Sequence, residues 1–303
     1  MTRRVAVLMG GRSAEREVSL TSGSACAAAL ERKGFAVERI DVAADLAQRL
    51  AETAPHVCFN ALHGRYGEDG CVQGLLEILR IPYTHSGVRA SAVAMHKPTA
   101  KELFARAGLR APDGALATLA EIAAGAVMAP PFVVKPAAEG SSVGVLVIDD
   151  LDDPRLRPNA GPDDDEALLV EPFVAGAELT CAVLDGAALT VTEIRPREGF
   201  YDYRAKYTEG VADHLVPAPV PPAIFERVLR WSERAHAALG CRGVSRADFR
   251  FDPAHGEDGL FILEVNTQPG MTPLSLVPEQ AAHCGLGFDD LVVRLVEDAS
   301  CDR

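Results

Sequence analysis

A strand, a turn and a second strand near the C-terminus constrain this chain more than any other feature. Residues 245–251 and 261–266 alternate as in a β-hairpin, and residues 252–259 between them are rich in turn formers. Because side chains alternate faces along a strand, one face of the hairpin is predicted to be apolar. Its residues are Ala247, Phe249, Phe251, Phe261, Leu263 and Val265. This face must pack into a core, which leaves the opposite face for polar chemistry.

The opposite face gathers charged and amide side chains. A symmetric turn would form the cross-strand pairs Arg250–Ile262, Asp248–Glu264 and Arg246–Asn266. Facing carboxylates destabilise a strand pair, so Asp248 and Glu264 call for a compensating ligand. With the amide oxygen of Asn266 they form an oxygen-only ligand set suited to Mg²⁺. The alternative interpretation is a solvated acidic edge, because mixed-charge strand faces are common at protein surfaces.

Length and charge argue against several classes of protein. The 303 residues, 48% of them hydrophobic, predict two or three domains with a real core. A net charge of −13 argues against binding nucleic acid or an anionic membrane. The seven cysteines contain no CxxC pair, which argues against a zinc knuckle or a disulfide framework. We find neither a signal peptide nor an apolar stretch of about 18 residues, so we expect a cytoplasmic protein.

The order of strand and helix signals predicts an α/β fold. The N-terminal strands, expected at residues 5–9, 36–42 and 56–62, alternate with helix patterns and predict a parallel sheet with helices on both faces. After a helix near residues 98–107, strand signals lie closer together and predict antiparallel hairpins. These strands are expected at residues 132–135, 143–148, 168–171, 178–184 and 189–194. A long helix is predicted at 222–239, and residues 150–166 read as a surface connection.

Two glycine-rich segments follow predicted N-terminal strands. The first, at residues 10–13, lacks the GxGxxG pattern, which argues against NAD. Glu15 comes next, either as an ordinary acid in the first turn of a helix or as a ligand contact. The second segment, at residues 62–70, begins beside His63 at the carboxyl edge of the sheet, where open α/β sheets bind ligands. His63 is therefore either a core histidine or a ligand contact.

The next candidate is a phosphate site. Lys135 ends an apolar strand, and the Gly/Ser turn at residues 139–144 leads to the next strand. The hydroxyl of Ser141 and backbone N–H groups in such a turn can cradle phosphate oxygens, and Lys135 adds a compact positive charge. The Walker P-loop motif is absent, because a strand follows here instead of a helix. A plain hairpin turn is the alternative interpretation.

Two further segments have functional features. Residues 195–216 lack helix or strand periodicity, and long loops of this kind are uncommon unless functional. Three tyrosines, Tyr207 among them, and Lys206 lie there, so we predict a lid. The tight turn after Asn266 contains Gly270, whose backbone N–H could point at developing oxyanion charge.

Taken together, these residues resemble the ATP-grasp superfamily and, within it, the D-alanine–D-alanine ligase family, over essentially the whole chain. The matching stretches are 10–11 with 15–19, 62–64 with 67–70, Lys97, 134–136 with 139–144, 201–203 with 205–207, Arg246 with Asp248, and Glu264 with 266–271. The resemblance implies an N-terminal open parallel α/β domain (1–93) and a two-part α+β ATP-grasp fold (94–176 and 177–303). ATP would lie between the last two parts.

The resemblance also implies an activity and a role for each site residue. ATP would phosphorylate the carboxylate of one D-alanine, and the amine of a second would attack the acyl phosphate, giving D-Ala-D-Ala for peptidoglycan. Lys97, Lys135, Glu171, Phe173, Val174, Glu178 and Lys206 would bind ATP, and Asp248, Glu264 and Asn266 would bind two Mg²⁺ ions, with Mn²⁺ as a possible substitute. Glu15, Ser141, Tyr207, Arg246 and Gly270 would serve catalysis, and His63, Ser275 and Leu276 would contact substrate. We expect a homodimer.

Two alternatives stay open. The first is a ligase of the same fold that joins D-alanine to D-lactate or D-serine. Tyr207 favours an amine acceptor, because the resemblance suggests that D-lactate-using relatives place a histidine there. The second is an ATP-binding regulator without turnover, which would require a broken metal set. The chain also departs from the family in carrying His96 before Lys97, where relatives often have an acid.

Overall fold

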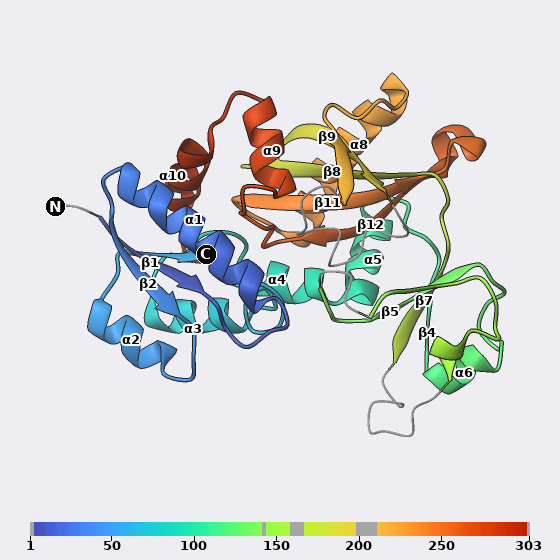
Figure 1. The fold of residues 1–303 in the computed structure, drawn as a ribbon, viewed down its shortest axis with the longest axis horizontal. Helices are drawn as coiled ribbons and strands as arrows, with labels where there is room; N and C mark the ends of the chain where they lie inside the picture. Colours follow the sequence, from blue (N-terminus) through green and yellow to red (C-terminus); the bar gives the residue numbers. More distant parts are fainter. Residues whose placement is uncertain (1–2, 141–143, 158–166, 198–210, 302–303) are drawn as a thin grey trace.

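The computed structural model describes residues 3–140, 144–157, 167–197 and 211–301. Within them the strands form three sheets (Figure 1). The N-terminal sheet has the order β2-β1-β3, with all strands parallel. Its elements are β1 (Arg4–Met9), α1 (Arg16–Arg32), β2 (Ala36–Asp41), α2 (Leu46–Thr53), β3 (Val57–Asn60) and α3 (Cys71–Leu79). The predicted parallel α/β arrangement of this part of the chain is therefore confirmed.

A four-stranded antiparallel sheet follows in the middle of the chain, with the order β4-β7-β5-β6. Its strands and short helices are β4 (Ala115–Ala117), α6 (Leu119–Ala123), β5 (Phe132–Pro136), β6 (Leu146–Ile148), η1 (Pro154–Leu156) and β7 (Leu168–Pro172). An apolar cluster around Phe132, Ile148 and Ile122 fixes α6 and η1 against it. Because β5 and β7 are neighbours, Lys135 and Glu171 come from adjacent strands.

The third sheet has five strands in the order β10-β9-β8-β11-β12. Its elements are β8 (Ala177–Leu184), β9 (Ala187–Pro196), β10 (Ala212–Leu215), α8 (Pro222–Leu239), β11 (Val244–Phe251), η2 (Pro253–Gly259) and β12 (Leu260–Asn266). The bounds of α8 match the predicted helix, which stops where Gly240 takes a positive φ of 75°. The apolar side of α8 packs on this sheet around Phe249 and Val228.

Four helices join these sheets (Figure 1). They are α4 (Val88–Met95), α5 (Lys97–Arg106), α9 (Leu276–His283) and α10 (Phe288–Asp298). Helix α5 lies against α8 and β12, and α10 lies beside α1. One apolar cluster consequently joins Val5 and Phe59 of the N-terminal sheet to Leu291 of α10 and Val244 of β11. The C-terminal end of the chain thus packs on the N-terminal sheet, while the domain boundaries expected near residues 93 and 176 stay predictions.

The hairpin forms, but its register differs from a symmetric turn. Arg246 faces Asn266 and Asp248 faces Glu264, as predicted. A bulge then places Phe249 opposite Ile262 and leaves Leu263 as the extra residue. The predicted pairing of Arg250 with Ile262 is therefore wrong. The bulge also changes which side chains of β12 are buried. Leu260 and Ile262 are fully buried, whereas Phe261 is only partly buried opposite Arg250 and Leu263 lines a cavity. The predicted apolar face is therefore wrong at Phe261 and Leu263.

Two other sequence expectations need correction. The segment 195–216 is not aperiodic throughout, because β9 continues to Pro196 and β10 pairs with it antiparallel. Helix α4 was not predicted, since its run of small residues has little amphipathic pattern.

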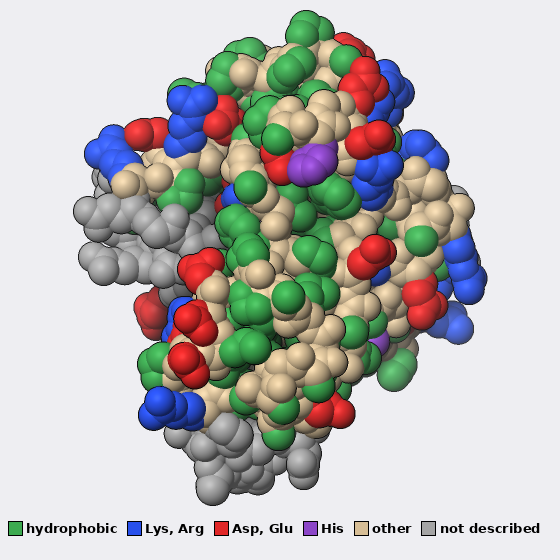
Figure 2. Space-filling view, turned by 90° about the vertical axis from the view of Figure 1, so that its right-hand side faces the viewer, with side chains coloured by type: hydrophobic (Ala, Val, Ile, Leu, Met, Phe, Trp, Pro, Cys, Tyr) green, Lys and Arg blue, Asp and Glu red, His purple; other side chains and the backbone are tan. Residues whose placement is uncertain are grey.

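None of the described helices is long and apolar enough to cross a membrane. On the face in Figure 2, basic and acidic side chains alternate around an apolar centre, so the described surface there has mixed charge.

Candidate active site

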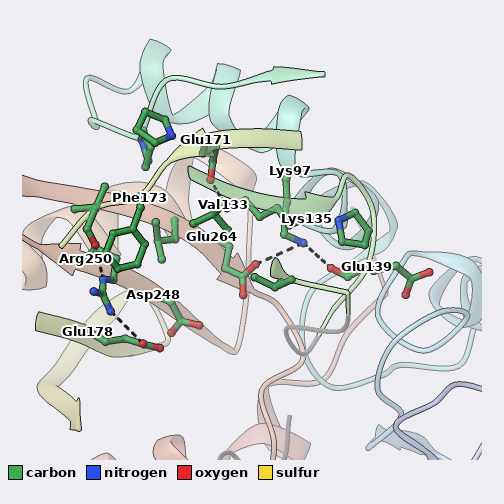
Figure 3. Close-up of a pocket in the computed structure, with 16 residues that line it drawn as sticks. Lys97, Val133, Lys135, Glu139, Glu171, Phe173, Glu178, Asp248, Arg250 and Glu264 are labelled. Atoms are coloured by element: carbon green, nitrogen blue, oxygen red, sulfur yellow. Dashed lines mark hydrogen bonds and ion pairs between the residues drawn. The ribbon is translucent and has the colours of Figure 1, made fainter. Parts of the chain in front are cut away.

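A cavity that is partly open to solvent lies between the two antiparallel sheets (Figure 3). It is lined from α5, β5, β7, β8, β11 and β12 and the segment between β7 and β8. The predicted site residues in its wall are Lys97, Lys135, Glu171, Phe173, Val174, Glu178, Asp248 and Glu264. Residues separated by up to 167 positions in the sequence are thus gathered around one hollow, as the sequence predicts.

Arg250 organises one end of this cavity. Its guanidinium lies 5.6 Å from the ring centroid of Phe173, its Nε donates to the backbone oxygen of Val174 at 3.0 Å, and its Nη1 lies 3.5 Å from Glu178. Burial lowers the pKa of Arg250 from its usual value, and the Glu178 carboxylate partly opposes this shift. In contact with Phe173, Val174 and Glu178, the guanidinium of Arg250 holds this wall of the cavity in place.

Glu171 lies deeper in the wall, with a side chain only 3% exposed. One carboxylate oxygen accepts from Lys135 and the other from Lys101 of α5. Two ammonium groups thus share one buried carboxylate, which compensates the cost of removing the charge from water.

The facing carboxylates lie on the β11–β12 hairpin, where Asp248 is two residues from Arg250 on β11 and Glu264 lies further along the cavity, toward Lys97 (Figure 3). Asp248 accepts from Arg246 at 2.6 and 2.8 Å and from the hydroxyl of Thr180 at 2.6 Å. Glu264 lies 3.6 Å from Nζ of Lys97, whose ammonium also donates to the backbone oxygen of Glu139 at 2.5 Å. The repulsion between the two carboxylates is therefore reduced by one cation on each side.

This donor set fits Mg²⁺. Asp248 and Glu264 supply hard anionic oxygens, and Asn266 supplies an amide oxygen that already accepts from the backbone N–H of Gln268 at 2.8 Å. In the described ranges, no group of three or more His, Cys, Asp or Glu side chains is placed to hold a metal ion. An ion here would therefore complete its shell with water and phosphate oxygens, which is the usual state of Mg²⁺.

A second polar wall comes from the N-terminal part of the chain. Glu15, His63 and Glu68 are 5%, 4% and 8% exposed. A side chain at Gly140 would lie 2.9 Å from Oε1 of Glu68 and 3.4 Å from Oε2 of Glu15, so glycine there lets the turn after β5 approach both carboxylates. The turn after β5 therefore comes close to Glu15 at Gly140, while the predicted link of Ser141 itself to Glu15 lies outside the described residues and stays a prediction.

Burial changes the charge of this wall. It raises the pKa of Glu68 to about 8, with a further contribution from the carboxylate of Glu15. Burial also lowers the pKa of His63 to about 4, so this imidazole is neutral near pH 7. Nε2 of His63 lies 3.4 Å from the hydroxyl of Ser22. The wall therefore offers hydrogen bonds from groups that burial keeps uncharged.

The turn after β12 is docked on the same wall. The side-chain oxygen of Gln268 accepts from Asn60 at 3.2 Å, and the backbone N–H of Met271 donates to Ser22 at 3.3 Å. A Cβ at Gly270 would come 2.8 Å from the Ser275 hydroxyl, so these two predicted residues are adjacent. Leu276 follows as the first residue of α9.

Comparison with known proteins identifies the family. The model "D-ala D-ala ligase C-terminus" matches residues 115–297, and "D-ala D-ala ligase N-terminus" matches residues 45–86. The D-alanine–D-alanine ligase of Cereibacter sphaeroides is 57% identical over 99% of this chain and 97% of its own length. The corresponding protein of Caulobacter vibrioides is 54% identical over 98% and 93%. This chain belongs to the D-alanine–D-alanine ligase family.

Solved structures of the D-alanine–D-alanine ligase family share its fold. The Bacillus anthracis ligase superimposes with a TM-score of 0.82 and 32% identity, covering 98% of this chain and 97% of that one. The same protein complexed with ATP gives a TM-score of 0.79. The predicted fold class, an ATP-grasp fold behind an N-terminal α/β domain, is confirmed.

Three of the predicted site residues, Ser141, Lys206 and Tyr207, lie outside the described residues. His96, the departure from the D-alanine–D-alanine ligase pattern, caps α5: its Nδ1 lies 2.7 Å from the hydroxyl of Thr99 and accepts from the Thr99 backbone. It thus helps to set the start of the helix that carries Lys97.

Sequence reasoning missed three residues of this site. The strand pattern places Arg250 on the polar face of the hairpin but predicts no role for it, and Glu68 is predicted only as part of a glycine-rich segment. Lys101 has no predicted role, although its spacing of four from Lys97 puts both lysines on one face of α5.

Proposed function

We propose that this protein joins two D-alanines into D-alanyl-D-alanine for peptidoglycan, using ATP to form an acyl phosphate. One observation carries this proposal. A hollow of about 370 Å³ lined by Lys97, Glu264, Asn266, Glu68 and Gly140 lies between the metal carboxylate and the buried N-terminal wall. The proposed metal ligands Glu264 and Asn266, the cation of Lys97 and the buried carboxyl of Glu68 therefore line one hollow, where the carboxylate of a first D-alanine could meet phosphate.

The nucleotide occupies the larger cavity in this proposal. Glu171 and the backbone of Phe173 and Val174 hold adenine, and Glu178 holds the ribose. Lys97, Lys135 and Lys206 bind phosphate oxygens. The apolar and aromatic wall with a few ionic groups suits a nucleotide, whose base is flat and whose tail is charged.

Asp248, Glu264 and Asn266 would hold Mg²⁺, with Mn²⁺ as a substitute. Two bound ions would supply positive charge to the phosphates during transfer. The chain itself supplies Lys97 beside Glu264 and Arg246 beside Asp248. Each of these cations offsets the charge of the carboxylate beside it.

The N-terminal wall and the turn after β12 hold the amino acids. Glu15 binds the ammonium of the first D-alanine, with the neutral His63 beside it. Ser141 of the Gly/Ser turn and Tyr207 of the lid both form hydrogen bonds that connect these segments to Glu15. Arg246 and the backbone N–H of Gly270 stabilise the tetrahedral intermediate. Ser275 and Leu276 receive the carboxylate of the second D-alanine.

A panel of acceptors tests this function. The protein is incubated with ATP, Mg²⁺ and D-alanine alone, or with D-alanine plus D-lactate, D-serine or L-alanine, and phosphate and products are both measured. We expect one D-Ala-D-Ala per phosphate and no depsipeptide. Preferential formation of D-alanyl-D-lactate would identify the alternative ligase, and absence of any phosphate release would identify a binding protein without turnover.

The protein is further proposed to be a cytoplasmic homodimer. All seven cysteines are free, as in a reducing compartment. Ile78 and Leu79 at the end of α3 are 80% and 36% exposed, and a second copy would remove them from water. Ile78→Lys should shift the sedimentation coefficient from that of a dimer to that of a monomer, and an unchanged coefficient would exclude this surface.

A further inference from the structure

The geometry points to Lys101 as the positioning residue that holds Glu171 in place for the nucleotide base and frees Lys135 for the phosphates. This inference rests on the nucleotide roles proposed above. Lys101 lies outside the cavity wall, and its role would be to maintain the selectivity of the site for adenine.

Glu171 has one carboxylate and two lysine partners. Lys135 binds one oxygen from β5, within the cavity wall, and Lys101 binds the other oxygen from α5. Lys101 is not among the residues that line the cavity, and its side chain is 14% exposed. It therefore holds Glu171 from behind, on the side away from the ligand.

The surrounding backbone fixes this arrangement. A Cβ at Gly114 would lie 2.9 Å from Nζ of Lys101 and 3.1 Å from Cγ of Glu171, so the chain packs directly over the pair. Lys97 lies one helical turn before Lys101, and its ammonium is 3.6 Å from Glu264 at the metal end. One face of α5 therefore supplies a cation to each end of the cavity.

The two lysines cannot have the same role. A Lys135 ammonium that contacts phosphate must give up part of its hold on Glu171, because a compact ammonium has only three donors and both anions need it close. Without Lys101, Glu171 would then remain as a buried carboxylate without a paired cation, which is strongly unfavourable. With Lys101 in place, Glu171 keeps one paired cation while Lys135 moves between its two anions.

This arrangement has a consequence for base selectivity. An ionised carboxylate accepts a hydrogen bond from the exocyclic amine of adenine, whereas guanine presents a carbonyl oxygen at the same position, which the carboxylate repels. Loss of Lys101 should therefore weaken ATP binding and also weaken discrimination against GTP. A role limited to folding would change stability without changing the ratio between the two nucleotides.

Steady-state kinetics of Lys101→Met with ATP and GTP test this inference. We expect KM for ATP to rise about tenfold and the ratio of kcat/KM for ATP over GTP to fall by a similar factor, as for a lost bond to a charged group. The KM for D-alanine should not change. Arg106→Met, which removes an exposed cation from the same helix, is the matched control and should behave as wild type.

A double-mutant cycle isolates the pair. If Lys101 acts through Glu171, Lys101→Met should add no further loss of selectivity to Glu171→Gln. Lys101→Gln keeps a donor without the charge and replaces the Met variant if that variant does not fold. Unchanged selectivity in a folded Lys101 variant, or additive losses in the double variant, would overturn the inference. Failure of wild type to form dipeptide would instead count against the proposed function.

Discussion

Two regions of this site treat charge in opposite ways: the end proposed to bind the nucleotide, and the N-terminal wall of Glu15, His63 and Glu68, which is proposed to bind the substrate and is called the substrate wall below. At the nucleotide end, carboxylates are matched with cations, as in the partly buried Asp248 with Arg246 and the buried Glu171 with its two lysines. At the substrate wall, burial itself suppresses charge, raising the pKa of Glu68 to about 8 and lowering that of His63 to about 4. The first region can exchange partners with an incoming anion, whereas the second presents fixed neutral donors and acceptors around Glu15.

This difference suits the two halves of the reaction. Phosphates bring several negative charges, and preformed ion pairs let the protein meet them with cations already in position. An acyl phosphate must instead be kept from water until the amine attacks, and a dry wall with few mobile charges serves that need. We therefore expect substitutions at the nucleotide end to change ATP binding and turnover, and substitutions at the substrate wall to change the pH dependence of stability.

The largest effect is expected at the metal carboxylates. Glu264→Gln removes charge from the proposed ligand set and should lower turnover by at least ~10²-fold. Folding should survive, because the substitution also relieves the repulsion from Asp248 across the hairpin. Turnover at saturating Mg²⁺ and the melting temperature together check this, and near-wild-type turnover would refute the metal assignment.

The charge state of the substrate wall should appear in the pH dependence of stability. Glu68 is protonated in the folded protein up to a pKa of about 8 but ionises near 4.5 when unfolded. The folded state therefore binds more protons in this interval, and the free energy of unfolding falls as pH rises. Between about pH 6 and about pH 7.5 the loss from this group is about 2 kcal/mol, at ~1.4 kcal/mol per pH unit.

Glu68→Gln should remove that loss. Urea unfolding of the nucleotide-free protein at the two pH values measures it, with wild type as the reference. His63 titrates mainly at lower pH, because its folded pKa is depressed, and its contribution is common to both proteins. A variant as pH-sensitive as wild type in this interval would show that Glu68 is not held neutral.

At the nucleotide end, Lys135→Met keeps much of the side-chain volume and deletes the charge. We expect ATP affinity to fall about tenfold or more, from loss of a charge-assisted contact. The melting temperature should change little, because Lys101 still pairs with Glu171. Titration calorimetry with ATP checks the affinity, and unaltered binding would mean that the turn at residues 139–144 does not cradle phosphate.

The smallest effect is expected for the lid. Tyr207→Phe removes one hydroxyl, and loss of one neutral hydrogen bond of ~0.5 to 1.5 kcal/mol implies a several-fold effect on closure. Some ATP should then be hydrolysed without ligation. Phosphate and dipeptide are measured together, and a ratio that stays at one with an unchanged rate would show that this tyrosine does not close the site.

Much of this site could be predicted from the sequence, because its residues follow strands or sit in recognisable turns. The pairing of Asp248 with Glu264 was predicted from strand alternation together with a symmetric turn. The turn is not symmetric, and the bulge at Leu263 restores this pairing. The faces that residues 260–263 take could not be predicted, because a bulge is a local backbone choice that leaves no mark in a run of four apolar residues.

The role of Lys101 could not be predicted from the sequence for a different reason. Its partner Glu171 lies 70 positions away, and the contact depends on how α5 sits on the four-stranded sheet. On a helix surface, a lysine four residues after another is ordinary, and only the tertiary structure shows that its ammonium reaches a buried carboxylate. Long-range ion pairs of this kind cannot be read from spacing.

The central claim is that both regions act on one acyl phosphate, and D-alanine labelled with ¹⁸O in its carboxylate tests it most directly. The carboxylate oxygen that attacks the γ-phosphorus leaves with phosphate when the amine displaces it. The account predicts one ¹⁸O in each phosphate released during D-Ala-D-Ala synthesis, measured by mass spectrometry. Unlabelled phosphate accompanying labelled dipeptide would contradict it.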